Sequence, residues 1–371
     1  MQNTATAAPA SRTSHLVEFA LKGLAAMYDP EKRFFCHRLV KTSRGMVREG
    51  ISPRYTIMTL LGLMRAEAAG LESPIDVEET TDRLLADTGW VDNIGDLGLL
   101  LWLCAVSSPE RLKRCTSTFD LSTALRRFPD ARHYLTMELS WFLTGLAEAS
   151  KAQGKSNFEM LARETYDLVR KNQGAFGLFG HMGTSQSLTG FLRGRVGSFA
   201  DQVYPIIAMS YFSRVFGDEE ARDNALRCAN AICERQGTLG QWWWHYDSAN
   251  GRVVEHFPVY SVHQHAMGPM ALLAAEEAFD VDFQAPIHRG LKWINGANEM
   301  KQDLEDSDAG VVWRCITPPN AGSFTKAVRT LMGREPRQGA FEILYECRPY
   351  ELGWLLYAFA GPSSADPSRR N

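Results

Sequence analysis

The segment that decides the fold is 93–106, which reads NIGDLGLLLWLCAV. Its apolar residues cover every face of a helix instead of one stripe, which is typical of a helix enclosed by protein on all sides. The segment before it, 76–88, carries many charges and has the one-sided apolar spacing of a helix that faces solvent. The two segments therefore predict a helical hairpin with an exposed outer member and an enclosed inner member.

The same alternation recurs along the whole chain, while alternating β patterns are scarce. The apolar inner helices are predicted to begin near Pro53, Asn93, Thr136, Ala200, Ser261 and Tyr350. The charged outer helices are predicted at 14–28, 76–88, 119–127, 156–172, 219–235 and 284–296. A hairpin that repeats roughly every 60 residues indicates a closed or stacked helical array.

These hairpins predict an all-α fold, the (α/α)6 toroid or barrel of six helical hairpins, as a single domain over 14–361. A closed ring is favoured over an open solenoid because the inner helices are apolar on all sides and no polar stripe recurs along them. The long connections 173–199, 236–260 and 297–348 are expected to carry function. The segments 1–13 and 362–371 are predicted to be disordered tails.

Composition excludes several classes of partner. The chain has 371 residues, of which 45% are hydrophobic, and its net charge of −3 offers no basic field for nucleic acid or an anionic membrane. The first fourteen residues lack the apolar core of a secretion signal, so a cytoplasmic location is the default expectation. The seven cysteines are scattered without a CxxC pair, which predicts reduced thiols and no metal site. The sequence does not determine the oligomeric state.

Polar side chains open each apolar helix, and in a ring of parallel inner helices these starts converge on one rim. Helix capping is an alternative explanation for the acids and amides among them, because such groups satisfy free backbone N–H groups. Arg54, His263 and Arg348 fit capping poorly, since a cation at a helix amino end opposes the helix dipole. We therefore expect a cup that binds a small polar molecule or an oligosaccharide.

The residues expected to bind this substrate are polar or aromatic and lie at the helix starts or in the aromatic loop QWWWHYDSANG over 241–251. They are Arg54, Tyr55, Gln202, Tyr204, Trp243, His245, Tyr260, Gln264, His265, Arg348, Tyr350 and Glu351. Aromatic faces can stack on the C–H surfaces of sugars, although a run of Trp residues can also be simple hydrophobic anchorage. Arg54 and Arg348 could clamp a carboxylate or phosphate of the substrate, or could form structural ion pairs with Glu346 or Glu351.

The pattern resembles the six-hairpin glycosidase-like superfamily, whose (α/α)6 toroids include glycoside hydrolases, unsaturated uronyl hydrolases, lyases, sugar epimerases and phosphorylases. The resemblance covers about 14–361 as architecture, and the stretch 242–270 looks like the lead into an active-site helix of such enzymes. No family-specific catalytic signature aligns residue by residue. The resemblance implies a carbohydrate-active enzyme, a hydrolase, lyase or epimerase.

A second resemblance involves the Q-x3-G-x-W repeat of terpenoid cyclases and related α/α toroids. Gln236, Gly240 and Trp242 fit this repeat, and QGAFGLF over 173–179 is a degenerate copy. The cyclase acid motif DxDD is absent, with Asp306 and Asp308 the closest approach, and no prenyltransferase-type zinc arrangement is found. The repeats therefore support the fold more than a terpenoid substrate.

Glycosidic bonds are usually cleaved by two carboxyl groups, one protonated and one ionised. Asp96, Glu138, Asp201 and Glu351 are the candidates. Glu138, with Trp141 one turn away, is predicted to be the general acid, and Asp201 the base.

Two histidines, His263 and His265, could instead shuttle protons at a sugar carbon, which would mean epimerisation or elimination, although His265 could equally be a core residue. No phosphate-binding loop, GxSxG or HExxH motif is present, so no cofactor is expected.

Three functions remain open at this point. The leading hypothesis is an enzyme that acts on an oligosaccharide or sugar acid. The second is a terpenoid-cyclase-like or prenyltransferase-like enzyme, which would have a cup lined mostly by aromatic residues with one buried acid. The third is a non-catalytic binding protein on the same scaffold, which would lack two carboxyl groups within the roughly 5–10 Å that sugar hydrolysis uses.

Overall fold

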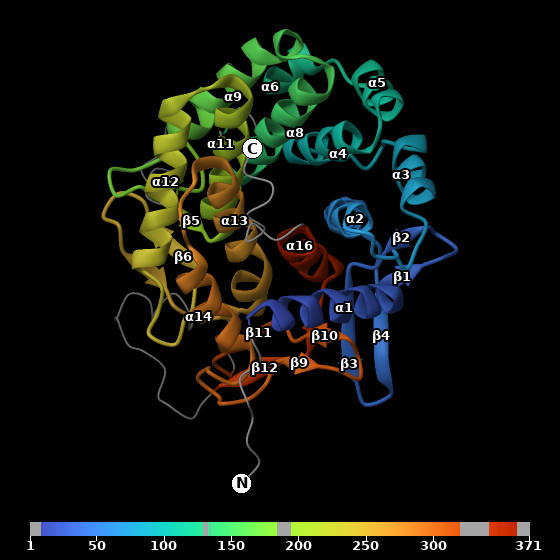
Figure 1. The fold of residues 1–371 in the computed structure, drawn as a ribbon, viewed down its shortest axis with the longest axis vertical. Coiled ribbons are helices and arrows are strands. Elements are labelled where there is room, and N and C mark those ends of the chain that lie inside the picture. The colour runs from blue at the N-terminus through green and yellow to red at the C-terminus, as the bar shows by residue number, and fades with distance from the viewer. Residues whose placement is uncertain (1–8, 129–132, 134, 184–193, 320–340, 362–371) are drawn as a thin grey trace.

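A computed structural model gives the fold, and it describes all residues except 1–8, 129–132, 134, 184–193, 320–340 and 362–371. Helices dominate the described part of the chain and form two concentric layers around a common centre (Figure 1). The inner layer consists of α2 (Pro53–Ala68), α4 (Ile94–Ser107), α8 (Thr136–Gln153), α11 (Ala200–Phe216), α13 (Gly268–Phe279) with the π-helical turn η3 (His263–Met267) before it, and α16 (Pro349–Phe359). The outer layer consists of α1 (Pro9–Met27), α3 (Val77–Ala86), α5 (Pro109–Thr118), α9 (Glu159–Arg170), α12 (Glu219–Glu234) and α14 (Gln284–Ile294).

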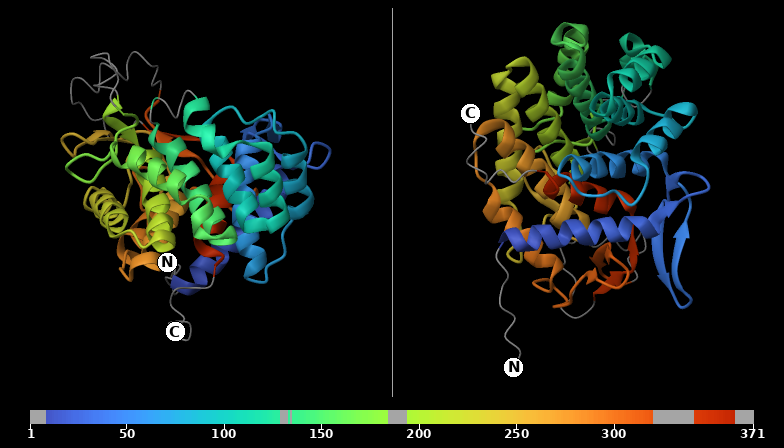
Figure 2. Two further views of the ribbon diagram at one scale, coloured as in Figure 1. Left: turned by 90° about the horizontal axis from the view of Figure 1, so that it is seen from above. Right: turned by 45° about the vertical axis from the view of Figure 1, so that its right-hand side comes forward.

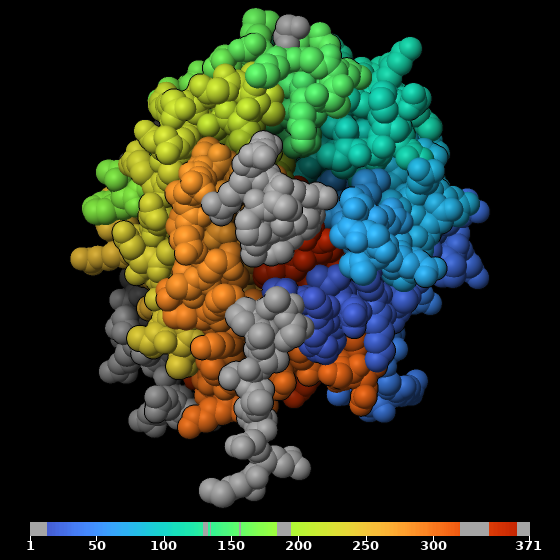
Figure 3. Space-filling model, in the orientation of Figure 1, coloured from blue at the N-terminus to red at the C-terminus, as the bar shows by residue number. Residues whose placement is uncertain are grey.

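The inner helices form a closed ring in which each packs on its two neighbours. Contacts run from α2 through α4, α8, α11 and α13 to α16, and α16 packs back against α2 and under α1. Figure 2 shows the helices standing side by side when the ring is seen from the edge. Figure 3 shows α16, in red, in the middle of one face between α1 and the later helices. The predicted all-α (α/α)6 toroid is confirmed.

Burial separates the two layers as the sequence predicts. Every residue of α4 from Ile94 to Cys104 is buried. The outer helix α12 instead buries one face, with residues such as Ala225, Cys228 and Ile232, and exposes the other. The apolar surface removed from water in the inner layer is the main stabilising contribution to such a fold.

Glycines let the inner helices approach backbone to backbone where the ring closes. A Cβ atom added to Gly62 of α2 would lie 2.0 Å from the carbonyl oxygen of Gly353 in α16. A Cβ on Gly98 of α4 would lie 2.3 Å from the backbone nitrogen of Phe142 in α8. Neither separation is compatible with a side chain, so these contacts fix the spacing of the ring.

One predicted outer helix was misplaced. The third was expected at 119–127, but the outer helix there is α5, which starts directly after α4. The hydroxyl of Ser108 caps it by accepting a hydrogen bond from the backbone N–H of Arg111, and Pro109 occupies the first turn. The segment 119–127 contains only the 3₁₀ turn η1 (Leu121–Thr123) and the single turn α6 (Ala124–Arg127).

Short strands line the connections between hairpins, where the sequence predicted long loops. They form small antiparallel sheets: β1 (Tyr28–Asp29) with β2 (Phe34–Phe35); β9 (Glu305–Asp306) with β10 (Val311–Val312); β13 (Glu346–Cys347), β3 (Arg38–Thr42) and β4 (Gly45–Glu49); β12 (Glu342–Leu344), β11 (Cys315–Thr317) and β8 (Val259–Tyr260); and β5 (Val196–Ser198), β6 (His245–Asp247) and β7 (Val253–Glu255). The further 3₁₀ turn η2 (Lys155–Asn157) precedes α9. The last of these sheets places the aromatic loop next to the start of α11.

The two Q-x3-G-x-W-like repeats have one structural role. The side-chain N–H groups of Gln236 donate to the carbonyl oxygens of Gly240 and Pro286, each at 2.9 Å, and so tie the loop to the next outer helix. Gln173 does the same with Gly177 and Asn224, again at 2.9 Å. The repeats therefore stabilise the scaffold, as their position after outer helices predicts.

Two further properties bear on the environment of the protein. None of the described helices is long and apolar enough to cross a membrane. All seven cysteines are free thiols, and six of them are buried.

Substituting Gly62 tests whether backbone approach closes the ring. Gly62→Ala is expected to lower the free energy of unfolding by about 1–3 kcal/mol, because the new methyl group overpacks the contact with Gly353. Gly89→Ala is the matched control, since its Cβ would meet only the flexible side chain of Asp87. Urea unfolding of the three proteins gives the comparison, and equal midpoints would contradict the assigned role of Gly62.

Candidate functional site at the amino ends of the inner helices

The amino ends of the inner helices meet at one end of the ring and carry a connected set of polar residues. In this set, which we call the polar rim, side chains from different helices pair with one another. It comprises Arg54, Tyr55, Asp96, Glu138, His181, Asp201, Arg348, Tyr350 and Glu351. Most of these residues were predicted from the sequence as catalytic or substrate-binding.

Arg54 of α2 pairs with Asp96 of α4. Its Nε donates to Asp96 Oδ1 at 2.6 Å, while the side-chain amide of Asn93 donates to Asp96 Oδ2 at 2.9 Å. Asp96 is only 3% exposed, but the Arg54 side chain is 35% exposed. The buried carboxylate thus holds a guanidinium that solvent can reach.

Glu138, in the first turn of α8, lies beside this pair. A Cβ on Gly95 would be 3.0 Å from Glu138 Cγ, which places Glu138 against the first turn of α4. Trp141, one turn further, lies under the Arg54 guanidinium at 5.8 Å and contacts Tyr204 of α11 edge-on at 5.0 Å. Arg54 therefore lies close to two carboxyl groups and one aromatic face.

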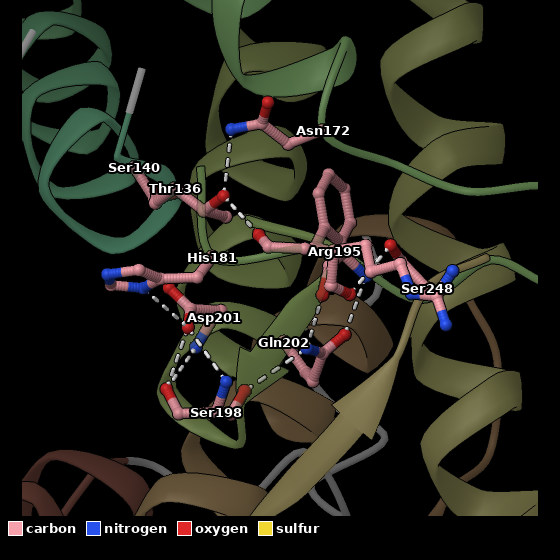
Figure 4. Close-up of polar contacts among 11 residues, drawn as sticks. Thr136, Ser140, Asn172, His181, Arg195, Ser198, Asp201, Gln202 and Ser248 are labelled. Atoms are coloured by element: carbon pink, nitrogen blue, oxygen red, sulfur yellow. Dashed lines mark hydrogen bonds and ion pairs between the residues drawn. The ribbon is translucent and has the colours of Figure 1, made fainter. Parts of the chain in front are cut away.

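Asp201, in the first turn of α11, is fixed by three donors. The Ser198 backbone N–H and hydroxyl donate to Asp201 Oδ2 at 2.8 and 2.9 Å, and His181 Nδ1 lies 3.2 Å from the same oxygen. Figure 4 shows His181 and Ser198 pointing toward Asp201 from different segments. Asp201 is 1% exposed and its Oδ1 is enclosed by protein, whereas the His181 side chain is 42% exposed.

Glu351 of α16 is the most deeply buried acid of the polar rim. It pairs with Arg314 through Nη1, and burial raises the pKa of Glu351 to about 7 despite this guanidinium. Arg314 Nε also lies 3.1 Å from Glu346 Oε1, and Arg348 Nη2 lies 3.4 Å from the same oxygen. Arg348 Nη1 donates to the Tyr55 hydroxyl at 2.9 Å, which links α16 back to α2.

Aromatic contacts complete the circle. Tyr55 and Tyr350 lie 4.7 Å apart between ring centroids, and Phe199, just before α11, contacts His263 at 4.5 Å. Tyr260 lies 5.3 Å from His263 and under the Arg314 guanidinium at 5.1 Å. Contacts between neighbouring side chains therefore run around the whole amino-terminal end of the ring.

Two predicted binding amides face backbone instead of the rim. Gln202 Oε1 accepts from the backbone N–H of Phe179 at 2.8 Å and its Nε2 donates back to the Phe179 carbonyl at 2.9 Å. Gln264 makes the same pair of bonds with Trp242, at 3.0 and 3.1 Å. Both residues are 0% exposed. We therefore assign these amides to the scaffold, where they hold the aromatic residue of each repeat.

The histidines of the fifth inner helix are buried. His263 is 5% and His265 0% exposed, and burial lowers the pKa of each to about 3. Such imidazoles stay neutral at physiological pH and are poor proton acceptors. We leave both out of the proton-transfer groups proposed below.

Of the other predicted aromatic residues, Tyr204 and Trp243 are fixed by packing and hydrogen bonds, whereas His245 is partly exposed. Tyr204 is buried and accepts a hydrogen bond from Trp354 Nε1 at 2.9 Å. Trp243 donates from Nε1 to the Arg235 carbonyl at 3.0 Å, which anchors the loop. His245 is 26% exposed and pairs with Glu255.

Three residues of the site were not predicted. His181, Arg314 and Glu255 lie in long connections. His181 and Arg314 contact the starts of α11 and α16, whereas Glu255 contacts His245 on the neighbouring strand β6. Arg314 follows the apolar run VVW over 311–313, and a cation directly after such a run was a detectable signal of a buried ion pair.

Two cavities lie away from the polar rim. One of about 340 Å³ is lined by the acidic segment 302–308 with Trp313, Ile343 and Tyr345. Another of about 310 Å³ lies at the carboxyl ends of α8 and α11, beside Glu148, Tyr211 and Arg214. Neither cavity is lined by a residue predicted to be catalytic or substrate-binding, although Asp306 and Asp308, the closest approach to the cyclase acid motif, line the first.

Among the described residues, no cluster of His, Cys, Asp and Glu could hold a metal ion.

Comparison with known proteins supports the fold class. No family model matches the sequence, and no curated protein matches it either. The fold is that of the six-hairpin (α/α)6 toroids, as the sequence resemblance predicted.

Solved structures share this fold at low identity. An unsaturated glucuronyl hydrolase from Bacillus sp. GL1 matches with a TM-score of 0.62 at 15% identity, over 94% of this chain and 95% of that one. A possible GH105 member from Klebsiella pneumoniae matches at 0.62 and 13%, over 97% and 94%. A sugar epimerase from a ruminal bacterium matches at 0.58 and 11%, over 95% and 98%.

The buried His265 makes the free energy of unfolding depend on pH. Its folded pKa of about 3 lies below the ordinary value of 6.5, so between these values the unfolded chain binds more protons and stability falls as pH falls. Between pH 6 and 4, His265 should lower the free energy of unfolding of the wild type by about 1.4 kcal/mol for each unit of pH decrease. His265→Phe should abolish this contribution. Urea unfolding across this range measures it, with the exposed His15→Gln as control. Parallel curves for wild type and His265→Phe would contradict the burial argument.

Proposed function

We propose that this protein is a carbohydrate-active enzyme that acts on an oligosaccharide or sugar acid at the polar rim. The observation that carries the proposal is the pairing of buried carboxylates with solvent-accessible Arg and His side chains around one end of the ring. Sugar chemistry needs this combination, because acids transfer protons and guanidinium groups recognise anionic substituents. Enzymes named as glucuronyl hydrolases and a sugar epimerase share the fold, which supports the same class.

Glu138 is the proton donor in this proposal. It is partly exposed, it stands beside the aromatic face of Trp141, and it lies near Arg54. A carboxyl group in such a position can deliver its proton to the oxygen of a breaking glycosidic bond. Asp96, fully engaged by Arg54 and Asn93, acts as the fixed negative charge that positions Arg54.

Asp201 works through His181 on the proton-accepting side. Its Oδ1 is enclosed and its Oδ2 is held by Ser198 and His181, so the carboxylate itself does not reach a substrate. The carboxylate orients the half-exposed imidazole and stabilises its protonated form. The Asp201–His181 pair then removes a proton from the attacking water or from the sugar.

Arg348 and Arg54 recognise the anionic group of a sugar acid. Both are partly exposed, at 22% and 35% of the side chain, and each is held in place by a carboxylate or a phenol.

The free thiols support a cytoplasmic location, since disulfides are rare in reducing compartments.

The alternatives are less consistent with the site. A terpenoid-type cup would be lined by aromatic residues around one buried acid, whereas the polar rim combines Asp96, Glu138, Asp201 and Glu351 with arginines. A binding protein would keep affinity but show no turnover. Measuring binding and turnover with the same ligand distinguishes an enzyme from a binding protein.

Turnover by the purified protein should depend on Glu138 and Asp201. We expect a screen of glycans and sugar acids to find a substrate whose kcat falls by about 10²–10⁴ in Glu138→Gln and Asp201→Asn while binding is retained. Glu148→Gln, at the opposite end of the same helix as Glu138, is the control and should keep its activity. Unchanged rates in both site variants would remove these roles, and binding without turnover in the wild type would favour the binding protein.

A further inference from the structure

A second histidine–carboxylate pair stands next to the Asp201–His181 pair. His245, at the start of β6, places Nδ1 2.7 Å from Glu255 Oε2 on β7. The two side chains are 26% and 22% exposed. This is the only hydrogen bond of the imidazole among the described residues, and the proposed reaction does not use it.

The pair determines which nitrogen of His245 accepts a hydrogen bond. An ionised carboxylate has only acceptor oxygens, so the shared hydrogen belongs to Nδ1. The neutral imidazole then has a lone pair and no hydrogen on Nε2. In the neutral imidazole, Glu255 thereby leaves Nε2 as the hydrogen-bond acceptor toward a ligand.

Strand register places His245 at the polar rim. His245 is directly opposite Ser198 in the antiparallel pairing of β5 with β6, and opposite residues share a face of the sheet. Ser198 is the residue that holds Asp201. The pairing is secured by the Phe199 backbone N–H, which donates to the Trp244 carbonyl at 2.8 Å.

Aromatic rings join His245 to the remaining rim. Trp244 stacks on the imidazole with centroids 4.4 Å apart and contacts Tyr260 edge-on at 5.3 Å. The stacked pair forms a flat surface that ends in an acceptor nitrogen. Flat apolar surfaces beside single polar atoms are typical of sites that orient a small ligand.

We infer that His245 is a specificity-determining residue that accepts a hydrogen bond from a hydroxyl group of an uncharged sugar unit, with Glu255 as its positioning residue. This inference rests on the proposed function and adds the orientation of the substrate. The exposed arginines of the polar rim, Arg54 and Arg348, lie on α2 and just before α16. His245 lies beside Asp201 and Glu255, and two arginines near it are already paired, Arg195 with Asp247 and Arg314 with Glu346 and Glu351. We therefore place the anionic end of the substrate toward α2 and α16 and a neutral, hydroxyl-bearing unit on the β6 side.

The tautomer of His245 is the first test and requires no substrate. Two-bond proton–nitrogen correlation spectra of ¹⁵N-labelled protein show which ring nitrogen carries the hydrogen, and His245→Gln assigns the signal. We expect the Nδ1–H form in the wild type and a shift toward the Nε2–H form in Glu255→Gln. An Nε2–H tautomer in the wild type would overturn the inference even if the enzyme proves to act on sugars.

Two substitutions of His245 then separate recognition from catalysis. His245→Phe keeps a ring on Trp244 but lacks the acceptor, so KM should rise about tenfold with kcat nearly unchanged. His245→Gln retains an acceptor and should recover most of this loss.

Removing the recognised hydroxyl from the substrate tests the same hydrogen bond from the side of the ligand. A substrate analogue that lacks the recognised hydroxyl should bind the wild type about tenfold more weakly and should show no further loss with His245→Phe. A large fall in kcat with His245→Phe, or equal losses for every deoxy analogue in both proteins, would overturn the inference. If no glycan binds at all, the proposed function fails, and with it the recognition role, whereas the tautomer result still decides the role of Glu255.

Discussion

The structure depends on the close approach of inner-helix backbones at glycine. At Gly62 and Gly353 the first and last inner helices touch without intervening side chains, and Gly98 lets α4 and α8 do the same. This spacing closes the ring at a fixed diameter, because protein interiors do not absorb an extra methyl group without displacement. A closed ring also leaves no end repeat that needs capping, unlike an open solenoid.

Closure has a chemical consequence at one end of the ring. The starts of neighbouring inner helices contact one another, as Arg54 contacts Asp96 and Phe199 contacts His263, so their free N–H groups and positive dipole ends lie at one end of the ring. Carboxylates such as Asp96 and Asp201 are stabilised there even when buried. Arginines are not, and those present are each held by a buried acid, as Arg54 is by Asp96 and Arg314 by Glu351. The polar rim is therefore an arrangement of paired charges that the convergence of the helix amino ends makes possible.

Much of this fold could be predicted from the sequence because the signal was repeated. Enclosed helices such as 93–106 are apolar all round, and five of the six outer helices were placed within a few residues of their observed positions. The prediction of the third outer helix was wrong because its cap signal, Ser108 followed by Pro109, comes directly after the apolar helix α4, with no loop between the two helices. Most of the short strands were missed because two or three residues are too few to show an alternating pattern. The two five-residue strands, β3 and β4, were missed because they are mostly exposed and do not alternate between buried and exposed residues.

The site was predictable only where the residues sit on helix starts. Arg54, Asp96, Glu138, Asp201 and Glu351 are found together at one end, as their positions in the repeat indicate. Gln202 and Gln264 share those positions, but tertiary packing turns their amides toward backbone. His181 and Arg314 were missed because they lie in connections and contact the starts of α11 and α16, twenty or more residues away in the sequence. Glu255 was missed because its partner His245 is reached through the short β6–β7 pairing, which the sequence did not predict.

The central claim is that substrate binds at the amino ends of the inner helices. A crystal structure of Glu138→Gln with a glycan that the protein turns over tests it most directly. We expect sugar density between Arg54, Glu138 and His181. Density confined to the cavity beside Tyr211 and Arg214, or to the acidic cavity beside Trp313, would contradict it.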